Sequence, residues 1–209
     1  MELLELIAAE RMRAADFGAG LGPDEYEMQS LCARWRVRDV LGHLLMPLVT
    51  PTPRVLFAVA RRGFNFDKAN VDLTARMRDL EVADLSRGLR ENANHPFKPP
   101  GMTHEAPLTD AVVHSQDMSR PVGRPVQPAP EAVTRCLDFV MTSRGARTFM
   151  SPKVREGLRF RANDLDWVSG QGDEVAGSGL DLLMALTGRE SALRLLSGAG
   201  AGEFSRRLA

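Results

Sequence analysis

Apolar residues follow a helical period through most of the chain. Near the N-terminus, Leu3, Ile7 and Met12 fall on one face of a predicted amphipathic helix. A stronger stripe predicts a core-facing helix, with apolar residues three or four positions apart at Val37, Val40, Leu41, Leu44 and Leu45. Pro47, Pro51 and Pro53 are expected to limit this helix at its C-terminal end, because proline lacks a backbone donor and clashes with the preceding turn. Similar patterns predict further helices over residues 54–60, 71–90, 108–119 and 131–143.

The period changes after about residue 145. Residues 158–162 alternate between apolar and charged side chains, as in a half-buried strand. Two shorter strands are predicted at 166–169 and 174–176, and two helices at 179–187 and 190–196. The chain is therefore predicted to be an α+β protein, with a helical domain over residues 1–147 and a small α/β domain over 148–209.

A proline-rich segment separates the predicted helices between residues 92 and 107. It is longer than most connections between elements, and loops of this length frequently carry binding or catalytic groups. We therefore expect it to be a site loop.

Composition narrows the class of protein. The 27 basic residues balance the 27 acidic ones, so neither nucleic acid nor an anionic membrane is an expected partner. No apolar run approaches the ~20 residues of a spanning helix. Two cysteines do not make a disulfide framework, which favours a reducing, cytoplasmic setting. Only three of the basic residues are lysines, an arginine bias typical of GC-rich bacterial genomes.

Histidine and aspartate supply the candidate chemistry. Asp110 and His114 are four positions apart, so both side chains project from one face of the same predicted helix. His43, on the second predicted helix, could add a nitrogen across the bundle. Two histidines and one carboxylate leave positions open on Zn²⁺ or a similar ion, as catalytic metal sites do. From spacing alone, a surface ion pair and a hydrogen-bonded core histidine remain alternatives.

Other polar residues have weaker roles. Asp117 could orient a ligand imidazole or cap the helix end. Four residues could contact a substrate or thiol, each with a structural alternative as surface charge, helix cap or solvated loop residue: Arg120, Arg124, Arg189 and His104. Cys32 and Cys136 lie in apolar contexts and are interpreted as core residues.

Three motifs extend over most of the chain. Two lie in the helical part, Trp35-x-Val37-x-Asp39-Val40-Leu41-x-His43-Leu44 and Asp110-x-x-Val113-His114-x-Gln116-Asp117. The third, near the C-terminus, is Asp164-x-Asp166-Trp167-x-x-Gly170-x-Gly172. Together they resemble the mycothiol-dependent maleylpyruvate isomerase family, within the DinB-like metal-binding four-helix-bundle superfamily.

The resemblance implies a DinB-like four-helix bundle followed by a small C-terminal α/β unit. It implies His43, Asp110 and His114 as metal ligands, although family members often carry glutamate at the carboxylate position. The implied cofactors are a divalent metal, zinc or alternatively nickel, and mycothiol, a low-molecular-weight thiol of actinobacteria. The implied activity is addition or transfer of that thiol to an electrophilic small molecule, as an isomerase or an S-transferase. The expected assembly is a monomer or homodimer.

The sequence is also compatible with two other functions. A non-catalytic DinB-like protein would bind metal or a small ligand without turnover. A metal-dependent hydrolase would use the same ligands to activate water, and it would need Asp117 or His104 as a general base.

Overall fold

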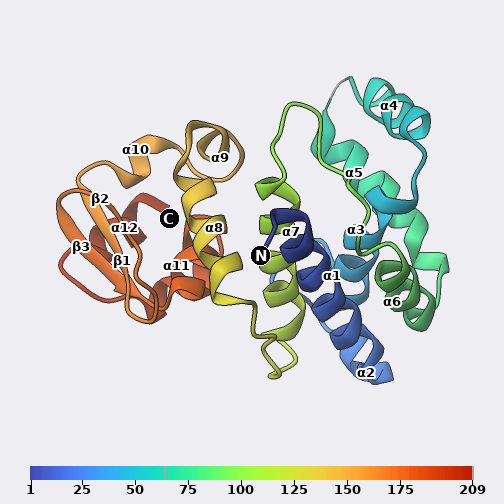
Figure 1. Ribbon diagram of the computed structural model, residues 1–209, viewed down its shortest axis with the longest axis horizontal. Helices are drawn as coiled ribbons and strands as arrows, with labels where there is room; N and C mark the ends of the chain where they lie inside the picture. Colours follow the sequence, from blue (N-terminus) through green and yellow to red (C-terminus); the bar gives the residue numbers. More distant parts are fainter. Residues whose placement is uncertain (64, 209) are drawn as a thin grey trace. The chain divides into compact units, whose positions relative to one another are not determined.

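The computed structural model describes residues 1–63 and 65–208. The chain divides into two compact units (Figure 1). The N-terminal unit comprises Met1–Lys98 and Asp110–Gln127, and the C-terminal unit comprises Pro99–Thr109 and Pro128–Ala209. Within the described ranges, no helix combines the length and apolar character of a membrane span.

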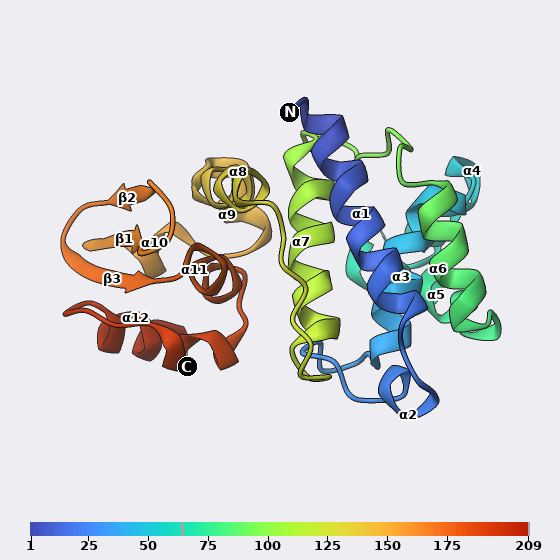
Figure 2. The ribbon, with the colours of Figure 1, turned by 60° about the horizontal axis from the view of Figure 1, so that its bottom comes forward.

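Three helices form the centre of the N-terminal unit: α1 (Leu3–Ala19), α3 (Val37–Val49) and α6 (Val82–Glu91). They lie side by side, and α7 (Glu105–Ser119) completes the bundle through its Asp110–Ser119 part (Figure 2). Met118 of α7 belongs to the same buried cluster as Leu41 of α3 and Leu85 of α6. The apolar stripe on α3 therefore faces the core, as its spacing predicts.

Smaller elements connect these helices. They are α2 (Pro23–Tyr26), α4 (Thr52–Arg61), α5 (Phe66–Ala75) and the 3₁₀ helix η1 (Arg76–Asp79). The single helix predicted over 71–90 is thus wrong, because η1 and an extended Leu80 separate α5 from α6. Helix α3 ends at Val49, before Pro51 and Pro53 as predicted, but it continues through Pro47. Proline at this position only removes the backbone bond to the His43 carbonyl, one turn earlier.

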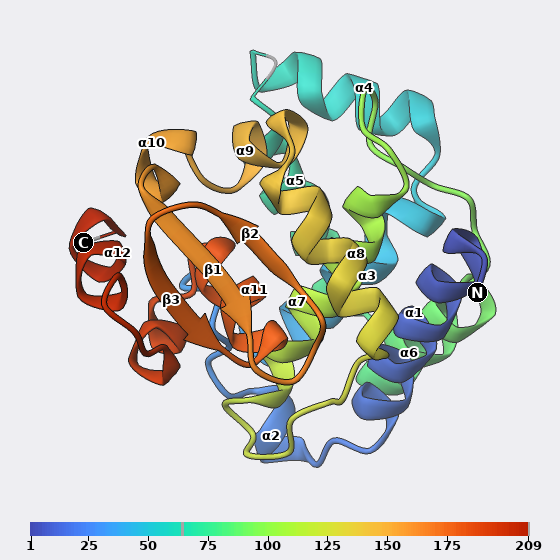
Figure 3. The ribbon, with the colours of Figure 1, turned by 60° about the vertical axis from the view of Figure 1, so that its left-hand side comes forward.

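The C-terminal unit is built on a three-stranded sheet in the order β2–β1–β3 (Figure 3). β1 (Leu158–Ala162) pairs antiparallel with β2 (Val168–Gly170) and parallel with β3 (Asp173–Gly177). Further elements of this unit are α9 (Ser143–Thr148), α10 (Pro152–Arg155), α11 (Gly179–Leu186), the 3₁₀ helix η2 (Glu190–Leu195) and α12 (Ala201–Leu208). A helical bundle with a separate small mixed sheet confirms the predicted α+β class.

The division between the units differs from the predicted boundary at residue 147. Helix α8 (Pro130–Met141) groups with the C-terminal unit, because its apolar face packs against α11. Its buried residues include Val133, Cys136 and Leu137. Helical periodicity identifies such a helix but does not identify the unit that it packs against.

Candidate metal centre

Two helices of the N-terminal unit bring His43, Asp110 and His114 together. His43 lies in the second turn of α3, and the other two residues lie one turn apart on α7. Asp110 Oδ1 is 3.4 Å from His43 Nε2 and 3.3 Å from His114 Nε2. The histidine rings meet edge to face, with centroids 4.8 Å apart. All three predicted ligands therefore converge through single N or O atoms.

This arrangement fits a small divalent ion. In a tetrahedral zinc site with bonds of 2.0–2.1 Å, neighbouring ligand atoms are about 3.3 Å apart. The two measured N···O separations match that spacing. His43 and His114 are largely buried, whereas 40% of the Asp110 side chain is accessible. Three protein ligands with one accessible side would leave a coordination position for an exogenous molecule.

The local fold of α3 fixes the place of His43. Asp39 lies at the third helical position, one turn before His43, and its Oδ2 accepts the Arg36 backbone N–H at 3.0 Å. Its Oδ1 accepts the Arg78 Nε–H at 2.8 Å. A buried carboxylate with both oxygens in use therefore anchors the first turn of the helix.

His114 is held at both ring nitrogens. While Nε2 faces Asp110, Nδ1 lies 2.8 Å from Asp117 Oδ2. Asp117 is fully buried, one turn further along α7. A metal-binding histidine commonly donates its second N–H to a carboxylate, which orients the ring. The sequence left two roles open for Asp117, orienting a ligand imidazole or capping the helix end. This geometry corresponds to the orienting role.

The charges in this cluster reinforce one another. Packing around the Asp110 carboxyl tends to raise its pKa, but the charges of His43 and His114 outweigh this and hold the pKa well below its usual range. Burial likewise tends to lower the pKa of His114. The Asp110 charge and hydrogen bonds to Asp110, Asp117 and Cys32 reverse that effect, and the pKa is raised well above its usual value. A cation would take the place of protons in this ion-paired group.

Two further residues at the site come from the loop before α3. The Trp35 ring stacks on His43, with centroids 4.7 Å apart and planes inclined by 32°. Cys32 is half-buried, and its Sγ lies 3.1 Å from Asp117 Oδ2 and 3.8 Å from His114 Nδ1. The interpretation of Cys32 as a plain core residue therefore misses its polar contacts, whereas Cys136 is fully buried. No sequence spacing links Cys32 to His114 and Asp117, which lie more than 80 residues later.

Sequence reasoning also missed Arg11 of α1. This arginine is 4% exposed, and its Nη1 donates to the backbone oxygens of Ala93 (2.9 Å) and His95 (2.7 Å). Burial lowers its pKa to about 10, and the charge of Asp110 opposes that shift. Arg11 thus ties the start of the predicted site loop to the bundle.

For the four remaining predicted contact residues, the structure shows other contacts or membership of the other unit. Arg124 pairs with Glu25 at 2.7 Å and lies over the Phe17 ring, so it braces its own unit. Arg120 Nε donates to Gln116 Oε1 at 3.2 Å. Arg189 and His104 belong to the C-terminal unit, where Arg189 Nη1 donates to the Thr187 carbonyl oxygen at 2.7 Å. Substrate or thiol contacts by these four residues stay predictions.

Comparison with known proteins agrees with the motifs. Residues 7–85 match the family model described as the mycothiol maleylpyruvate isomerase N-terminal domain, a segment that includes His43. The fold matches a crystal structure of the mycothiol-dependent maleylpyruvate isomerase with a TM-score of 0.65 and 14% identity. A histidine-to-alanine mutant of such an enzyme matches with a TM-score of 0.60 and 12% identity. Both alignments cover 96% of this chain and 94% of the other. No curated protein shows a significant sequence match.

Proposed function

Because residues 7–85 match the model of the mycothiol maleylpyruvate isomerase N-terminal domain, we propose that the chain belongs to that family and is a metal- and thiol-dependent enzyme. Its reaction joins a low-molecular-weight thiol, mycothiol, to an electrophilic small molecule. The observation that carries this proposal is the convergence of His43 Nε2, His114 Nε2 and Asp110 Oδ1 at ligand spacing. The bound ion is zinc or nickel.

Each residue of the site has a defined task. A divalent cation here would lower the pKa of a coordinated thiol, so that the thiolate is available near neutral pH. His43 and His114 supply neutral nitrogen donors, while Asp110 supplies one negative charge and faces the accessible side. Asp117 accepts the His114 Nδ1–H and so keeps the Nε2 lone pair directed at the ion. The indole of Trp35 covers one face of His43 and excludes water from it.

The thiolate then forms a carbon–sulfur bond with the electrophile. If that bond breaks again after rotation about a neighbouring bond, the thiol is regenerated and the reaction is an isomerisation. If it persists, the product retains the thiol and the reaction is a transfer. Product analysis with stoichiometric thiol separates the two, because only transfer consumes it.

Hydrolysis is less well supported by this geometry. It requires a general base beside the open coordination position. Asp117 is fully buried and lies on the Nδ1 side of His114, opposite the nitrogen that faces Asp110. A binding protein without turnover would use the same ligands, and the thiol experiment below distinguishes it.

Metal binding can be tested through Trp35. A Trp167→Phe background leaves Trp35 as the single tryptophan, next to both histidines. Titration with Co²⁺ is expected to quench its fluorescence at about one equivalent per chain. His114→Ala and His43→Ala are expected to abolish the quench, and His95→Ala, at an exposed histidine of the same unit, is the matched control. Equal quenching in all variants would contradict the proposed site.

Thiol binding is tested on the Co²⁺-loaded protein. Mycothiol is expected to produce a sulfur-to-cobalt absorption band in the near ultraviolet, absent from the His114→Ala variant. A metal-loaded protein that gives no such band with mycothiol would support the binding-protein alternative and exclude the thiol-dependent enzyme.

A further inference from the structure

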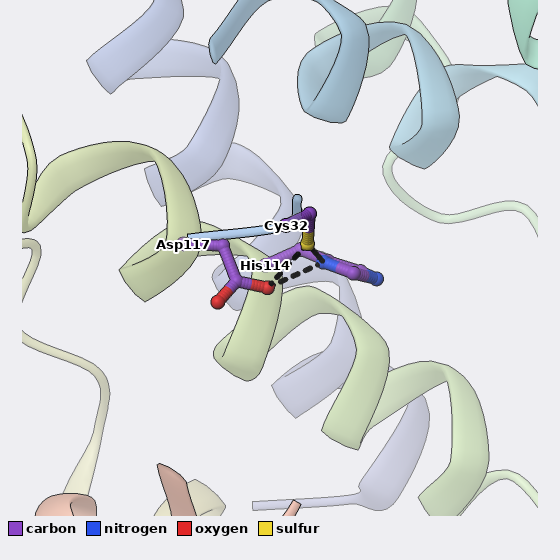
Figure 4. A group of neighbouring side chains, drawn as sticks. All are labelled: Cys32, His114 and Asp117. Atoms are coloured by element: carbon purple, nitrogen blue, oxygen red, sulfur yellow. Dashed lines mark hydrogen bonds and ion pairs between the residues drawn. The ribbon is translucent and has the colours of Figure 1, made fainter. Parts of the chain in front are cut away.

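Asp117 Oδ2 accepts from two side chains. One is the His114 ring through Nδ1 at 2.8 Å, and the other is the Cys32 thiol at 3.1 Å. Figure 4 shows the three groups turned toward one another, with Cys32 approaching from the loop and the other two from α7. Since Asp117 is fully buried, these side chains and not solvent determine where its carboxylate lies.

The backbone around Cys32 is fixed on both sides. The Cys32 N–H donates to Ser30 Oγ at 3.1 Å, and the Cys32 carbonyl oxygen accepts from Gln29 Nε2 at 2.8 Å. One residue earlier, the Leu31 N–H donates to the Asp117 carbonyl oxygen at 3.0 Å. The loop is therefore bound to Asp117 twice, once through the backbone of Leu31 and once through the sulfur of Cys32. Such a loop places the thiol at a defined position.

The same loop reaches both metal-site histidines in different ways. Trp35 stacks on the ring of His43, and the ring nitrogen Nδ1 of His43 is buried without a hydrogen-bond partner among the described residues. His114 is oriented instead by a hydrogen bond to Asp117. One histidine is thus positioned by stacking and the other by a carboxylate that the Cys32 thiol holds.

We propose that Cys32 is a positioning residue of the metal site. Its thiol donates to Asp117 Oδ2 and fixes the carboxylate where it accepts the His114 Nδ1–H, so that Nε2 points to Asp110 and His43. The proposal rests on the metal site of the proposed function, but it concerns a residue outside the ligand set. It assigns the thiol no covalent or ligand role.

The test compares a variant that deletes the donor with one that retains it. Cys32→Ala removes the hydrogen bond, whereas Cys32→Ser keeps a hydroxyl donor at the same position. Cys136→Ala, at a buried cysteine of the C-terminal unit, controls for the loss of a thiol elsewhere. The first readout is Co²⁺ affinity from Trp35 fluorescence in the Trp167→Phe background. The second is the NMR signal of the His114 Nδ1 proton in the metal-free protein.

Cys32→Ala is expected to weaken Co²⁺ binding about tenfold, as changes to groups behind a metal ligand typically do. Cys32→Ser is expected to restore affinity to within about threefold of the parent, and Cys136→Ala to leave it unchanged. The Nδ1 proton signal is expected to persist in the parent and in Cys32→Ser, and to broaden through solvent exchange in Cys32→Ala.

Two results would overturn the proposal. The first is a Cys32→Ala variant with parental affinity and an unchanged proton signal. The second is a Cys32→Ser variant as impaired as Cys32→Ala, since a donor role predicts rescue. If the parent binds no Co²⁺, the proposed function fails, and the proton signal of the metal-free protein alone decides the role of Cys32.

Discussion

His114 is held at the site through both of its ring nitrogens. Its two ring nitrogens face different carboxylates, Asp110 on one side and Asp117 on the other. A histidine held in this way has one nitrogen committed to a proton and the other available for a metal. In the proposed metal site, the orientation of His114 therefore depends on Asp117, which is not one of the three proposed ligands.

Asp117→Asn tests this dependence. The amide retains the size of the carboxylate but loses its charge, so it holds the His114 Nδ1–H less strongly. Co²⁺ affinity is expected to fall about 10- to 100-fold, with stoichiometry near one per chain retained. Isothermal titration calorimetry measures both quantities. Asp24→Asn, at an exposed aspartate of the same unit, is the control for removing one negative charge. Parental affinity in Asp117→Asn would show that the hydrogen bond does not orient the ligand.

At the scale of residues, the sequence predicts contacts between side chains that are close along one helix. Asp110 and His114 share a face because a helix places residues four apart on one side. Whether His43 joins that pair depends on how two helices pack, which spacing along the chain does not determine. The family resemblance implied His43 as the third ligand. Cys32 lies in an irregular loop, and its partner Asp117 is 85 positions away. No periodicity connects two such residues, so only the folded structure reveals the contact.

At the scale of elements, the start of α3 determines where His43 lies. Pattern analysis identifies this helix from its apolar stripe, but the helix continues two residues beyond Pro47 and ends before Pro51. In place of the helix predicted over 71–90, α5 starts earlier because the Asn65 side chain accepts from the Lys68 N–H at 2.9 Å, and η1 with the extended Leu80 separates it from α6. Hydrophobic spacing is insensitive to such capping and to short 3₁₀ segments.

Asp39→Ala is expected to destabilise the N-terminal unit. It deletes the acceptor for the Arg36 N–H and the partner of Arg78, which together are worth about 1–3 kcal/mol of unfolding free energy. Urea unfolding followed by Trp35 fluorescence measures the change in the Trp167→Phe background. Asp39→Asn keeps an acceptor for the helix start and is expected to lose less. An alanine variant as stable as the parent would mean that the carboxylate does not anchor the helix.

The sheet of the C-terminal unit carries its own charge cluster. Glu174 on β3 accepts from Arg159 and Arg161 on β1, and the hydrogen bond from Arg161 lowers the pKa of the carboxyl below its ordinary value of 4.5. Because the pKa is lower in the folded than in the unfolded state, the ionised carboxylate stabilises the fold at pH values above its unfolded-state pKa. This stabilisation is lost as the pH falls through the folded-state pKa.

Glu174→Gln should therefore alter the acid side of the stability profile. The unfolding temperature of the variant is expected to lie below that of the parent at pH 7, and the gap should close as pH falls below 4.5. Circular dichroism melts between pH 3 and pH 7 provide the measurement. Glu190→Gln removes an exposed glutamate of the same unit as control. A gap that stays constant with pH would rule out the ion pairs as its source.

For the whole molecule, the proposed metal ligands belong to one unit, and a second hydrophobic core belongs to the other. The three proposed ligands, Asp117 and Cys32 all lie in the N-terminal unit. The C-terminal unit has a core of its own, in which Phe160 of β1 and Phe204 of α12 meet edge to face at 5.1 Å. Each unit also contains one tryptophan, Trp35 or Trp167, so the two can be monitored separately.

Phe204→Ala is expected to affect the two units unequally. Removing a fully buried aromatic ring costs about 3–5 kcal/mol, which should lower the unfolding temperature of the C-terminal unit by about 10 °C or more. Trp167 reports this transition in a Trp35→Phe background. Trp35, in a Trp167→Phe background, is expected to report an unchanged transition and unchanged Co²⁺ affinity. If both tryptophans reported the same large decrease, the units would unfold as one cooperative body, and stability in the second core would then control occupancy of the metal site in the first.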